Sequence, residues 1–235
     1  MPGMSKSPNV PRPDDLVPMA YGRAAARKVR DGIWEPLWGG QRALIDVFGR
    51  DVRIRDQHGD ALEGYDLLRE AMVTAAQSAE MVADGYLLPA PLRDTTGAES
   101  VIGSQSLMTA GEMGRQFLLG GGFGRERHAE IEAERSRRVV LPSGSATAFV
   151  AIDLLWLDGE SLLDVPLMER KRLLESALLD GEVVRKTMTV RSPVEAWYAQ
   201  WRALGFREVA VKAANSRYTP GVPSPEWATA LIPRG

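Results

Sequence analysis

The side chains that most often carry metal or nucleophilic chemistry are scarce in this sequence. There is no cysteine, and the two histidines, His58 and His128, lie far apart without ligand spacing. The sequence therefore predicts neither a thiolate site nor a zinc-type metal site. The glycine run GGGFG at 120–124 is the one candidate phosphate loop. No strand pattern precedes it and no Lys-Ser or Lys-Thr follows it, so we interpret it as a flexible loop.

The composition is that of an ordinary globular protein. The chain has 235 residues, of which 44% are hydrophobic and 26% charged, enough for a substantial core in one domain. The formal net charge is −2, which argues against tight DNA binding because proteins that hold nucleic-acid phosphates usually carry a basic excess. The sequence offers no apolar run typical of a signal peptide or membrane span, and together with the lack of cysteine this predicts a cytoplasmic protein without membrane association.

The hydrophobic pattern predicts the elements that must position any site. ALIDVFGRDVRIRDQHG, residues 43–59, alternates apolar and polar residues around Gly49 and predicts a β-hairpin. A helix is expected over 63–76, and the segment 104–135 has a mostly helical composition. Further strands are expected in the segments 81–92, 147–157 and 207–214.

Two later helices carry recognisable ends. One begins near Pro166 and ends before Gly181. In SPVEAWYAQWRALGF, residues 192–206, we expect Ser192 as N-cap, Pro193 at the first helical position, Glu195 completing a capping box and Gly205 as C-cap. One face of this helix is apolar, and we interpret it as core rather than as a base-stacking platform. It consists of Val194, Trp197, Tyr198, Trp201 and Leu204.

The order of these elements predicts an α+β domain with largely antiparallel sheets flanked by helices, because hairpins replace a regular βαβ alternation. We expect this domain to cover residues 17–235. Residues 1–16 are rich in Pro, Ser and Asp and poor in large apolar side chains, which predicts a flexible N-terminal tail.

Five stretches, in order along the chain, resemble motifs of the adenylation domain of ATP-dependent DNA ligases, especially the bacterial type associated with end-joining repair. They are WEPLWGGQR at 34–42, VADGYLL at 82–88, FVAIDLLWLDGESLLDVPLMERKRLLE at 149–175, REVAVKAANSRYTPG at 207–221 and SPEWATALIP at 224–233. The resemblance implies a ligase-type nucleotidyltransferase (ATP-grasp-like) domain. The small OB-fold domain that follows it in that family is not expected within this chain.

The resemblance implies a chemistry that the residues do not support. In that family a lysine amine attacks the α-phosphate of ATP, assisted by metal, and the AMP passes to the 5′-phosphate of nicked DNA. Here Leu37 stands at the lysine position, and leucine has no lone pair, so adenylation through it is excluded. Further positions of the family's chemistry also differ, although Glu208 leaves a one-residue slip open beside Arg207. They are Gly39, Tyr86, Ile152, Arg207, Thr229 and Leu231.

Other motif positions match the family. The matching frame residues are Trp34, Pro36, Gly40, Asp84, Gly85, Pro166, Arg170, Tyr218, Pro220 and Gly221. Three matching positions are functional, and the resemblance places Glu35 near the adenine, Arg42 near the ribose and Lys212 near the phosphates. It also implies ATP and Mg as ligands, with weak binding. The alternative is that these charged residues are surface or ion-paired residues. We predict no catalytic residue and no metal ligand.

The sequence therefore predicts a ligase-like pseudoenzyme that has lost lysine self-adenylation and serves as an accessory or scaffold in DNA repair. Its expected partners are DNA-repair proteins, or DNA bound weakly. Two alternatives stay open. One is an enzyme that handles ATP or nucleic-acid ends noncovalently through Lys212, Arg42 and Glu208. The other is a protein-interaction module using RERHAEIEAERSRR at 125–138, which otherwise is a solvated helix face.

Overall fold

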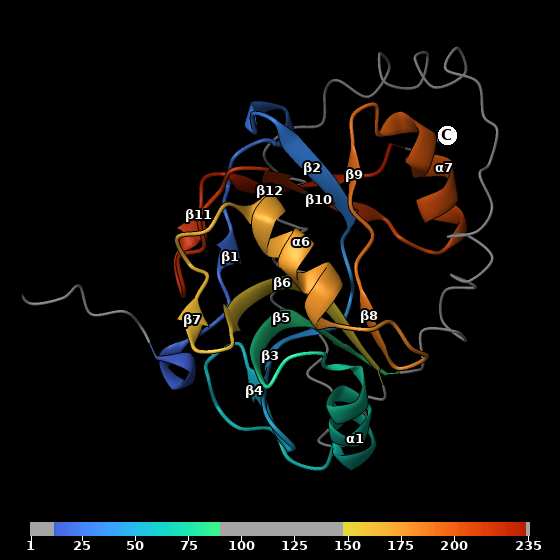
Figure 1. Ribbon diagram of the computed structural model, residues 1–235. Coiled ribbons are helices and arrows are strands. Elements are labelled where there is room, and N and C mark those ends of the chain that lie inside the picture. Colours follow the sequence, from blue (N-terminus) through green and yellow to red (C-terminus); the bar gives the residue numbers. More distant parts are fainter. Residues whose placement is uncertain (1–11, 90–147, 234–235) are drawn as a thin grey trace, which may run out of the picture.

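Two β-sheets face each other in the computed structural model, which describes residues 12–89 and 148–233 (Figure 1). The GGGFG run, His128, the expected helical segment 104–135 and the charged segment 125–138 lie outside these described residues. Within them, no helix combines the length and the apolar character needed to cross a bilayer.

The bounds of the elements are as follows. The helices are the 3-10 helices η1 (Pro13–Asp15) and η2 (Ala26–Lys28) and the α-helices α1 (Asp66–Ala75), α6 (Leu167–Ala177) and α7 (Glu195–Ala203). The strands are β1 (Ala20–Tyr21), β2 (Gly32–Pro36), β3 (Gln41–Phe48), β4 (Asp51–Asp56), β5 (Glu80–Leu88), β6 (Ala148–Leu157), β7 (Glu160–Ser161), β8 (Val184–Lys186), β9 (Val190–Arg191), β10 (Glu208–Ala213), β11 (Pro223–Ser224) and β12 (Trp227–Leu231).

The strand pairing confirms the predicted α+β class with largely antiparallel sheets. The large sheet has the order β4-β3-β5-β6-β7, with β8 pairing β6, and the small sheet has the order β12-β10-β2-β9. Only the β6–β8 pair and the separate β1–β11 pair are parallel among the described strands. The predicted hairpin is confirmed as β3 and β4, with Gly49 at φ +62° in the turn, a conformation that favours glycine.

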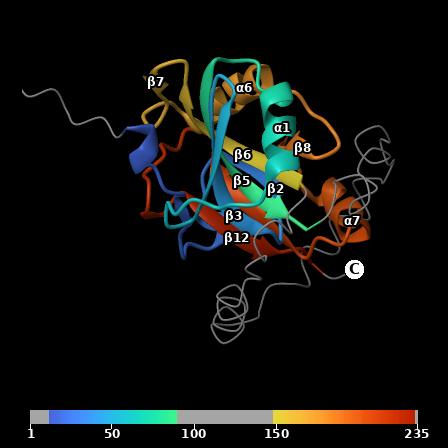
Figure 2. The ribbon, with the colours of Figure 1, turned by 90° about the horizontal axis from the view of Figure 1, so that it is seen from below.

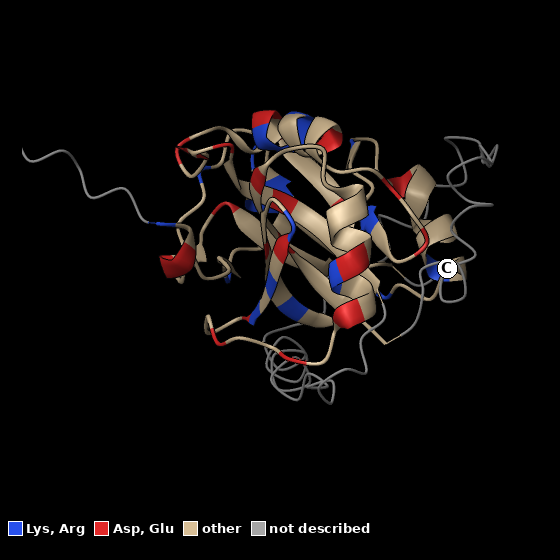
Figure 3. Cartoon of the chain, turned by 60° about the horizontal axis from the view of Figure 1, so that its bottom comes forward, with Lys and Arg blue, Asp and Glu red and all other residues tan. Residues whose placement is uncertain are grey.

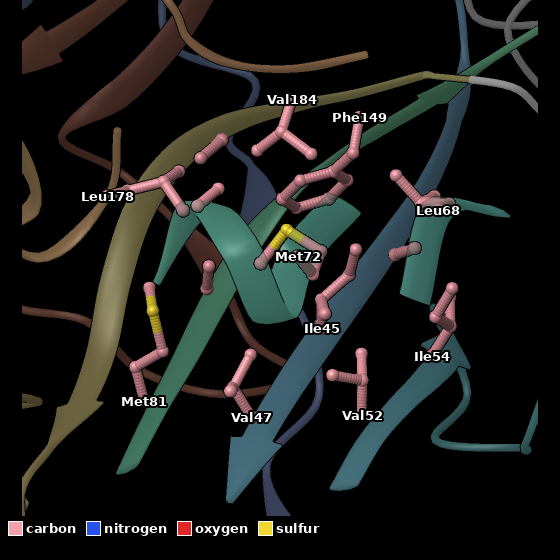
Figure 4. Close-up of a cluster of buried hydrophobic side chains, with 14 of the residues drawn as sticks. Ile45, Val47, Val52, Ile54, Leu68, Met72, Met81, Phe149, Leu178 and Val184 are labelled. Atoms are coloured by element: carbon pink, nitrogen blue, oxygen red, sulfur yellow. The ribbon is translucent and has the colours of Figure 1, made fainter. Parts of the chain in front are cut away.

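Alternation along the strands gives the large sheet two different faces. Ala43, Ile45 and Val47 of β3 belong to the core cluster beneath α1, where Met72 packs from the helix (Figure 4). Figure 2 shows α1 lying across the strands of the large sheet. Leu44, which alternates with them on β3, turns toward the small sheet and packs in a second cluster.

The small sheet has a corresponding arrangement, with α7 on its outer face. Val209 of β10 packs with Tyr198 and Trp201 of α7, which confirms the predicted core role of these aromatic residues. Trp201 is fully buried. The layers are therefore α1, large sheet, small sheet and α7, and the inner faces of the two sheets enclose the part of the interior where the motif residues gather.

The predicted start of α7 is wrong. The N-cap is Val194 rather than Ser192, and no side chain caps the helix. Val194 is 2% exposed within the cluster around Trp201, so apolar packing rather than a capping box positions the first turn. At the other end, the sequence predicted Gly205 as the C-cap. In the structure the C-cap is Leu204, and Gly205, at φ +89°, directly follows it.

The expected boundary of the N-terminal tail is also wrong for the residues that the structure describes. Leu16 and Met19 are each 1% exposed and pack between the sheets. Arg55 of β4 fixes the arm that leads to them, because its guanidinium donates to the carbonyl oxygens of Leu16 at 2.7 Å and Pro13 at 2.9 Å. The same guanidinium donates two hydrogen bonds to the Asp46 carboxylate, at 2.7 and 2.8 Å.

Replacing Arg55 with methionine should therefore release the arm and leave Asp46 buried without its partner. Removing one member of a buried pair typically costs about 3–5 kcal/mol in the free energy of unfolding, measurable by urea denaturation. Arg53→Met is the matched control, because the Arg53 side chain is 46% exposed and its ion pair with Asp14 lies at the surface. Equal stability of the two variants would contradict this role for Arg55.

Candidate functional site

The inner face of the small sheet buries charge. Glu35 of β2 and Lys212 of β10 are 1% and 0% exposed. The Lys212 Nζ atom lies 2.8 Å from Glu35 Oε2, and the Nζ atom of Lys171, from α6, lies 2.5 Å from Glu35 Oε1. One carboxylate is therefore shared by two buried ammonium groups. We call these three residues the Glu35 cluster.

Burial controls the protonation of the Glu35 cluster. It lowers the pKa of Lys212 to about 8, opposed by the Glu35 carboxylate and assisted by the charge of Lys171. Burial also disfavours the charged form of Glu35, but the two lysines outweigh it and hold the pKa of Glu35 below its ordinary value. The Lys212 ammonium lies 4.2 Å from the ring centroid of Trp227, a favourable cation–π contact. The Lys212 ammonium therefore contacts two side chains of the protein itself, the Glu35 carboxylate and the Trp227 ring.

The inner face of the large sheet carries a second buried pair. Arg42 of β3 donates two hydrogen bonds of 2.5 Å to the Asp84 carboxylate of β5. A third guanidinium nitrogen donates to the Tyr86 hydroxyl at 3.0 Å. The Tyr218 hydroxyl also donates to Asp84 at 2.7 Å and accepts from the backbone N–H of Met19. This network joins the large sheet, the loop after β10 and the N-terminal arm.

A third buried pair holds α6 against β6. Arg170 donates to the two carboxylate oxygens of Asp153 at 2.8 and 2.7 Å and to the Ser216 carbonyl at 3.1 Å. Burial disfavours the Asp153 carboxylate, but Arg170 outweighs that effect and holds its pKa below the ordinary value. The hydroxyl of Ser216 accepts from the Trp227 indole at 2.9 Å. The polar residues of this region are thus tied to one another.

The position of the expected nucleophile is apolar. Leu37 follows β2, is 8% exposed, and packs in one cluster with Tyr86, Ile152 and Ala210. Tyr86 and Ile152 come from neighbouring strands of the large sheet, whereas Ala210 comes from β10 of the small sheet. Three of the positions at which this chain departs from the ligase pattern therefore contact one another across the gap between the sheets.

Leu37 also lines a groove of about 350 Å³. Trp38 and Phe206 form part of its wall and pack edge to face, with ring centroids 4.9 Å apart. The Trp38 indole donates to Thr187 at 2.9 Å, which fixes the ring. The remaining lining residues are Gly39, Leu88, Pro89, Leu204, Gly205, Arg207 and Glu208.

Backbone packing accounts for the motif glycines that are present. A Cβ atom on Gly40 would lie 2.0 Å from the Leu87 carbonyl oxygen, and one on Gly85 would lie 2.2 Å from the Val150 carbonyl oxygen. Neither position accepts a side chain without moving the backbone. At Gly39, where the ligase pattern has an aspartate, a Cβ atom would meet nothing within 4 Å. The fold therefore leaves room for an aspartate at position 39, and steric constraints do not explain why glycine stands there.

The structure brings two of the three predicted site residues into contact. Glu35 and Lys212 form an ion pair, while Arg42 is held by Asp84. All three are buried and ion-paired. The sequence analysis missed Lys171, whose only signal is its place beside Arg170 in the helix after Pro166. Among the described residues, no group of three or more His, Cys, Asp or Glu side chains could hold a metal ion.

Comparisons with known proteins find similarity to ATP-dependent DNA ligases. Residues 124–229 match the family model for the ATP dependent DNA ligase domain. The chain is 28% identical over 220 residues to the multifunctional non-homologous end joining protein LigD of Mycolicibacterium smegmatis, covering 92% of this chain and 24% of that protein. A DNA ligase of Methanoculleus marisnigri is 40% identical over 78 residues, covering 33% of this chain and 14% of that protein. The chain thus spans about a quarter of the length of the LigD relative.

Solved structures show the same fold. The ligase domain of Mycobacterium tuberculosis LigD superposes with a TM-score of 0.61 at 23% identity, covering 94% of this chain and 60% of that chain. A mycobacterial DNA ligase D complexed with ATP and MES gives a TM-score of 0.57 at 23% identity, covering 93% of this chain and 60% of that chain. The predicted ligase-type nucleotidyltransferase fold is therefore confirmed.

Lys212 should make the stability of the protein depend on pH. The unfolded chain keeps the Lys212 proton up to about the ordinary pKa of 10.5, whereas the folded protein releases it near 8. Between these values the unfolded state binds more protons, so raising the pH favours folding by up to about 1.4 kcal/mol per pH unit.

The measurement is urea unfolding of the wild type and Lys212→Met from pH 7 to 9.5. The stability of the wild type relative to the variant should rise above pH 8, because the variant lacks the titrating group and still pairs Glu35 with Lys171. A constant difference across that range would contradict the assignment.

Proposed function

We propose that this chain, a homologue of the ATP-dependent DNA ligase domain of LigD end-joining proteins, keeps the fold of that domain without its self-adenylation chemistry. In this proposal it is a pseudoenzyme that serves as an accessory or scaffold in DNA repair. The homology supports a ligase-like domain. The loss of activity and the accessory role rest on the site.

The observation that carries the proposal is the apolar cluster around Leu37. Self-adenylation needs an amine whose lone pair attacks phosphorus, and the leucine side chain has none. Tyr86 and Ile152 occupy the positions of the ligase pattern's glutamate and adenine-stacking aromatic residue, and they pack against Leu37 instead of facing an open site. The replaced positions 37, 86 and 152 therefore contact one another. An alignment error of one residue at a single motif does not account for all three replacements.

The residues present do not fit ATP with magnesium. Tyr86, Ile152 and Leu37 pack against one another at the positions where the ligase pattern has its reactive and nucleotide-contacting residues. Lys212, which the resemblance places near the phosphates, is paired with Glu35 and fully buried. The described residues also lack a group of acidic side chains suited to a metal ion.

The partners that suit this proposal are DNA-repair proteins, or DNA held weakly. The relatives are named for non-homologous end joining, which supports a repair context. Tight DNA binding is disfavoured by the net charge of −2. In the described residues, Lys and Arg are interspersed with Asp and Glu, for example along α6 (Figure 3). The cysteine-free composition suits a reducing cytoplasm, where we place the protein.

A second candidate function is noncovalent handling of a nucleotide. The observation in its favour is the Glu35 cluster, because two buried ammonium groups share one carboxylate. Saturable, metal-dependent ATP binding that Lys212→Ala abolishes would support this second function over the first. The closed packing around Leu37 favours the first.

The wild-type protein should stay unmodified when incubated with ATP and magnesium or manganese, as measured by intact-mass spectrometry. It should also fail to seal nicked DNA. Covalent AMP on the wild type would overturn the proposal, because another residue would then act as the nucleophile.

A Leu37→Lys, Gly39→Asp variant shows whether the nucleophile is the only loss. Gly39 accepts a side chain without a clash. We expect this variant to remain unmodified as well, because Tyr86 and Ile152 still replace the glutamate and the aromatic residue of the ligase pattern and still pack beside position 37. If the variant alone were adenylated, the claim that the nucleophile is lost would stand. The claim that the site is closed would be contradicted.

A further inference from the structure

The loop that leads into β2 carries an excess of positive charge at the protein surface (Figure 1). Residues 23–31 have the sequence RAAARKVRD, in which Asp31 is the only acidic residue. The basic residues are all exposed, and they are Arg23, Arg27, Lys28 and Arg30. This excess differs from the mixed charges along α6 and from the formal net charge of −2 of the whole chain. We call residues 23–31 the basic loop.

The basic loop is fixed to the small sheet at both ends. Just before it, the backbone N–H of Gly22 donates to the carbonyl oxygen of Trp227 in β12 at 2.8 Å. At its other end, the carbonyl oxygen of Asp31 accepts from the backbone N–H of Ala214 at 3.0 Å. Between these points η2 forms a 3-10 turn that lies against β12. The loop therefore presents its side chains from a defined backbone.

The described part of the chain does not neutralise the cations of the basic loop. Within residues 12–89 and 148–233, Arg27, Lys28 and Arg30 make no ion pair. By contrast, the exposed guanidinium of Arg172 pairs with Glu169 on α6. An anionic partner therefore meets three exposed cations that do not first have to break an ion pair with these residues.

Arg191 of β9 extends this basic surface from the neighbouring strand. Its register partner on β2 is Ile33, and its guanidinium lies 3.6 Å from the Asp31 carboxylate. The Arg191 and Asp31 side chains are 62% and 60% exposed, and surface pairs of this kind contribute little to stability. A carboxylate from a partner can therefore replace Asp31 at Arg191 with little loss of stability.

We propose that the basic loop, together with Arg191, is the docking surface for an acidic peptide segment of a partner protein. Arginine suits this ligand, because its planar guanidinium binds a carboxylate through two parallel hydrogen bonds. The five residues of β2 separate the basic loop from Leu37, which is roughly 17 Å in an extended strand. Docking at this surface therefore goes beyond the loss of adenylation chemistry and does not depend on it.

The size of the surface favours a short peptide over a DNA duplex. Proteins that hold a duplex through its backbone make on the order of 6–10 phosphate contacts. The basic loop and Arg191 offer fewer cations than that. Negative charge also borders the surface, because Asp31 ends the loop and the exposed Glu226 precedes Trp227, the residue that Gly22 contacts. A long polyanion would meet these carboxylates, whereas a short acidic segment would not.

The test is the binding of a fluorescently labelled hexaglutamate peptide to the full chain, measured by fluorescence anisotropy. We expect saturable binding to the wild type that weakens as salt is added, because salt screens exposed charges. The triple variant Arg27→Gln, Lys28→Gln, Arg30→Gln should bind at least about tenfold more weakly. These side chains are exposed, so the variant should fold, and its thermal unfolding should match that of the wild type.

The matched control is Arg50→Gln, Arg53→Gln, Arg172→Gln. It changes the net charge by the same amount at exposed positions elsewhere, in the β3–β4 turn, in β4 and in α6. The control should bind hexaglutamate as the wild type does. A wild type that does not bind hexaglutamate saturably, or an equal loss of affinity in both triple variants, overturns the docking surface.

A short DNA duplex carrying the same label tests the other class of anion. It should bind the wild type more weakly than hexaglutamate does. If the duplex binds more tightly, and the basic-loop variant loses that binding, the assignment to an acidic peptide is wrong and the surface is one for nucleic acid.

Lys28 allows a measurement on the wild type itself, because it is the one exposed lysine among the described residues. Saturating hexaglutamate should slow the acetylation of Lys28 by acetic anhydride, as read by peptide mass spectrometry. Acetylation at an unchanged rate would contradict docking at the basic loop. Both measurements give the same answer whether or not the wild type forms covalent AMP, so they separate this proposal from the loss of ligase activity.

Discussion

The arrangement of the two sheets depends on the hydrogen bonds that the buried Asp84 carboxylate accepts. It is 0% exposed and accepts hydrogen bonds from Arg42 of β3 and from Tyr218 in the loop after β10. Tyr218 in turn holds the backbone of Met19 in the N-terminal arm. A buried carboxylate is tolerated only when such partners compensate for its lost hydration. Asp84 therefore requires these three segments to meet at one point.

The same reasoning separates the motif residues that are present from those that are absent. Arg42, Asp84, Arg170 and Tyr218 all make buried hydrogen bonds that fix one segment to another. The fold needs these residues whether or not the protein performs chemistry. By contrast, Leu37 packs with two other replaced positions, Tyr86 and Ile152, in an apolar cluster. A fold can in this way outlast the site that it once carried.

Local patterns predicted the elements better than they predicted the contacts. The β3–β4 hairpin and the buried face of α7 followed from alternation and helical spacing, which depend on neighbours in sequence. The pairing of Lys171 with Glu35 joins α6 to β2 across the fold, and no local pattern carries that information. The helix start at Val194 and the burial of Leu16 were missed for the same reason, because tertiary packing overrides a capping signal and a polar composition.

The unfolding free energy of Asp84→Asn tests the central claim most directly, namely that structural contacts explain the motif residues that remain. The substitution leaves Arg42 buried without its charge partner, and we expect a loss of about 3–5 kcal/mol in urea denaturation. Asp66→Asn, at an exposed ion pair of α1, should leave stability unchanged. If Asp84→Asn were as stable as the wild type, the carboxylate would not hold the sheets together, and the structural explanation of the retained motifs would be wrong.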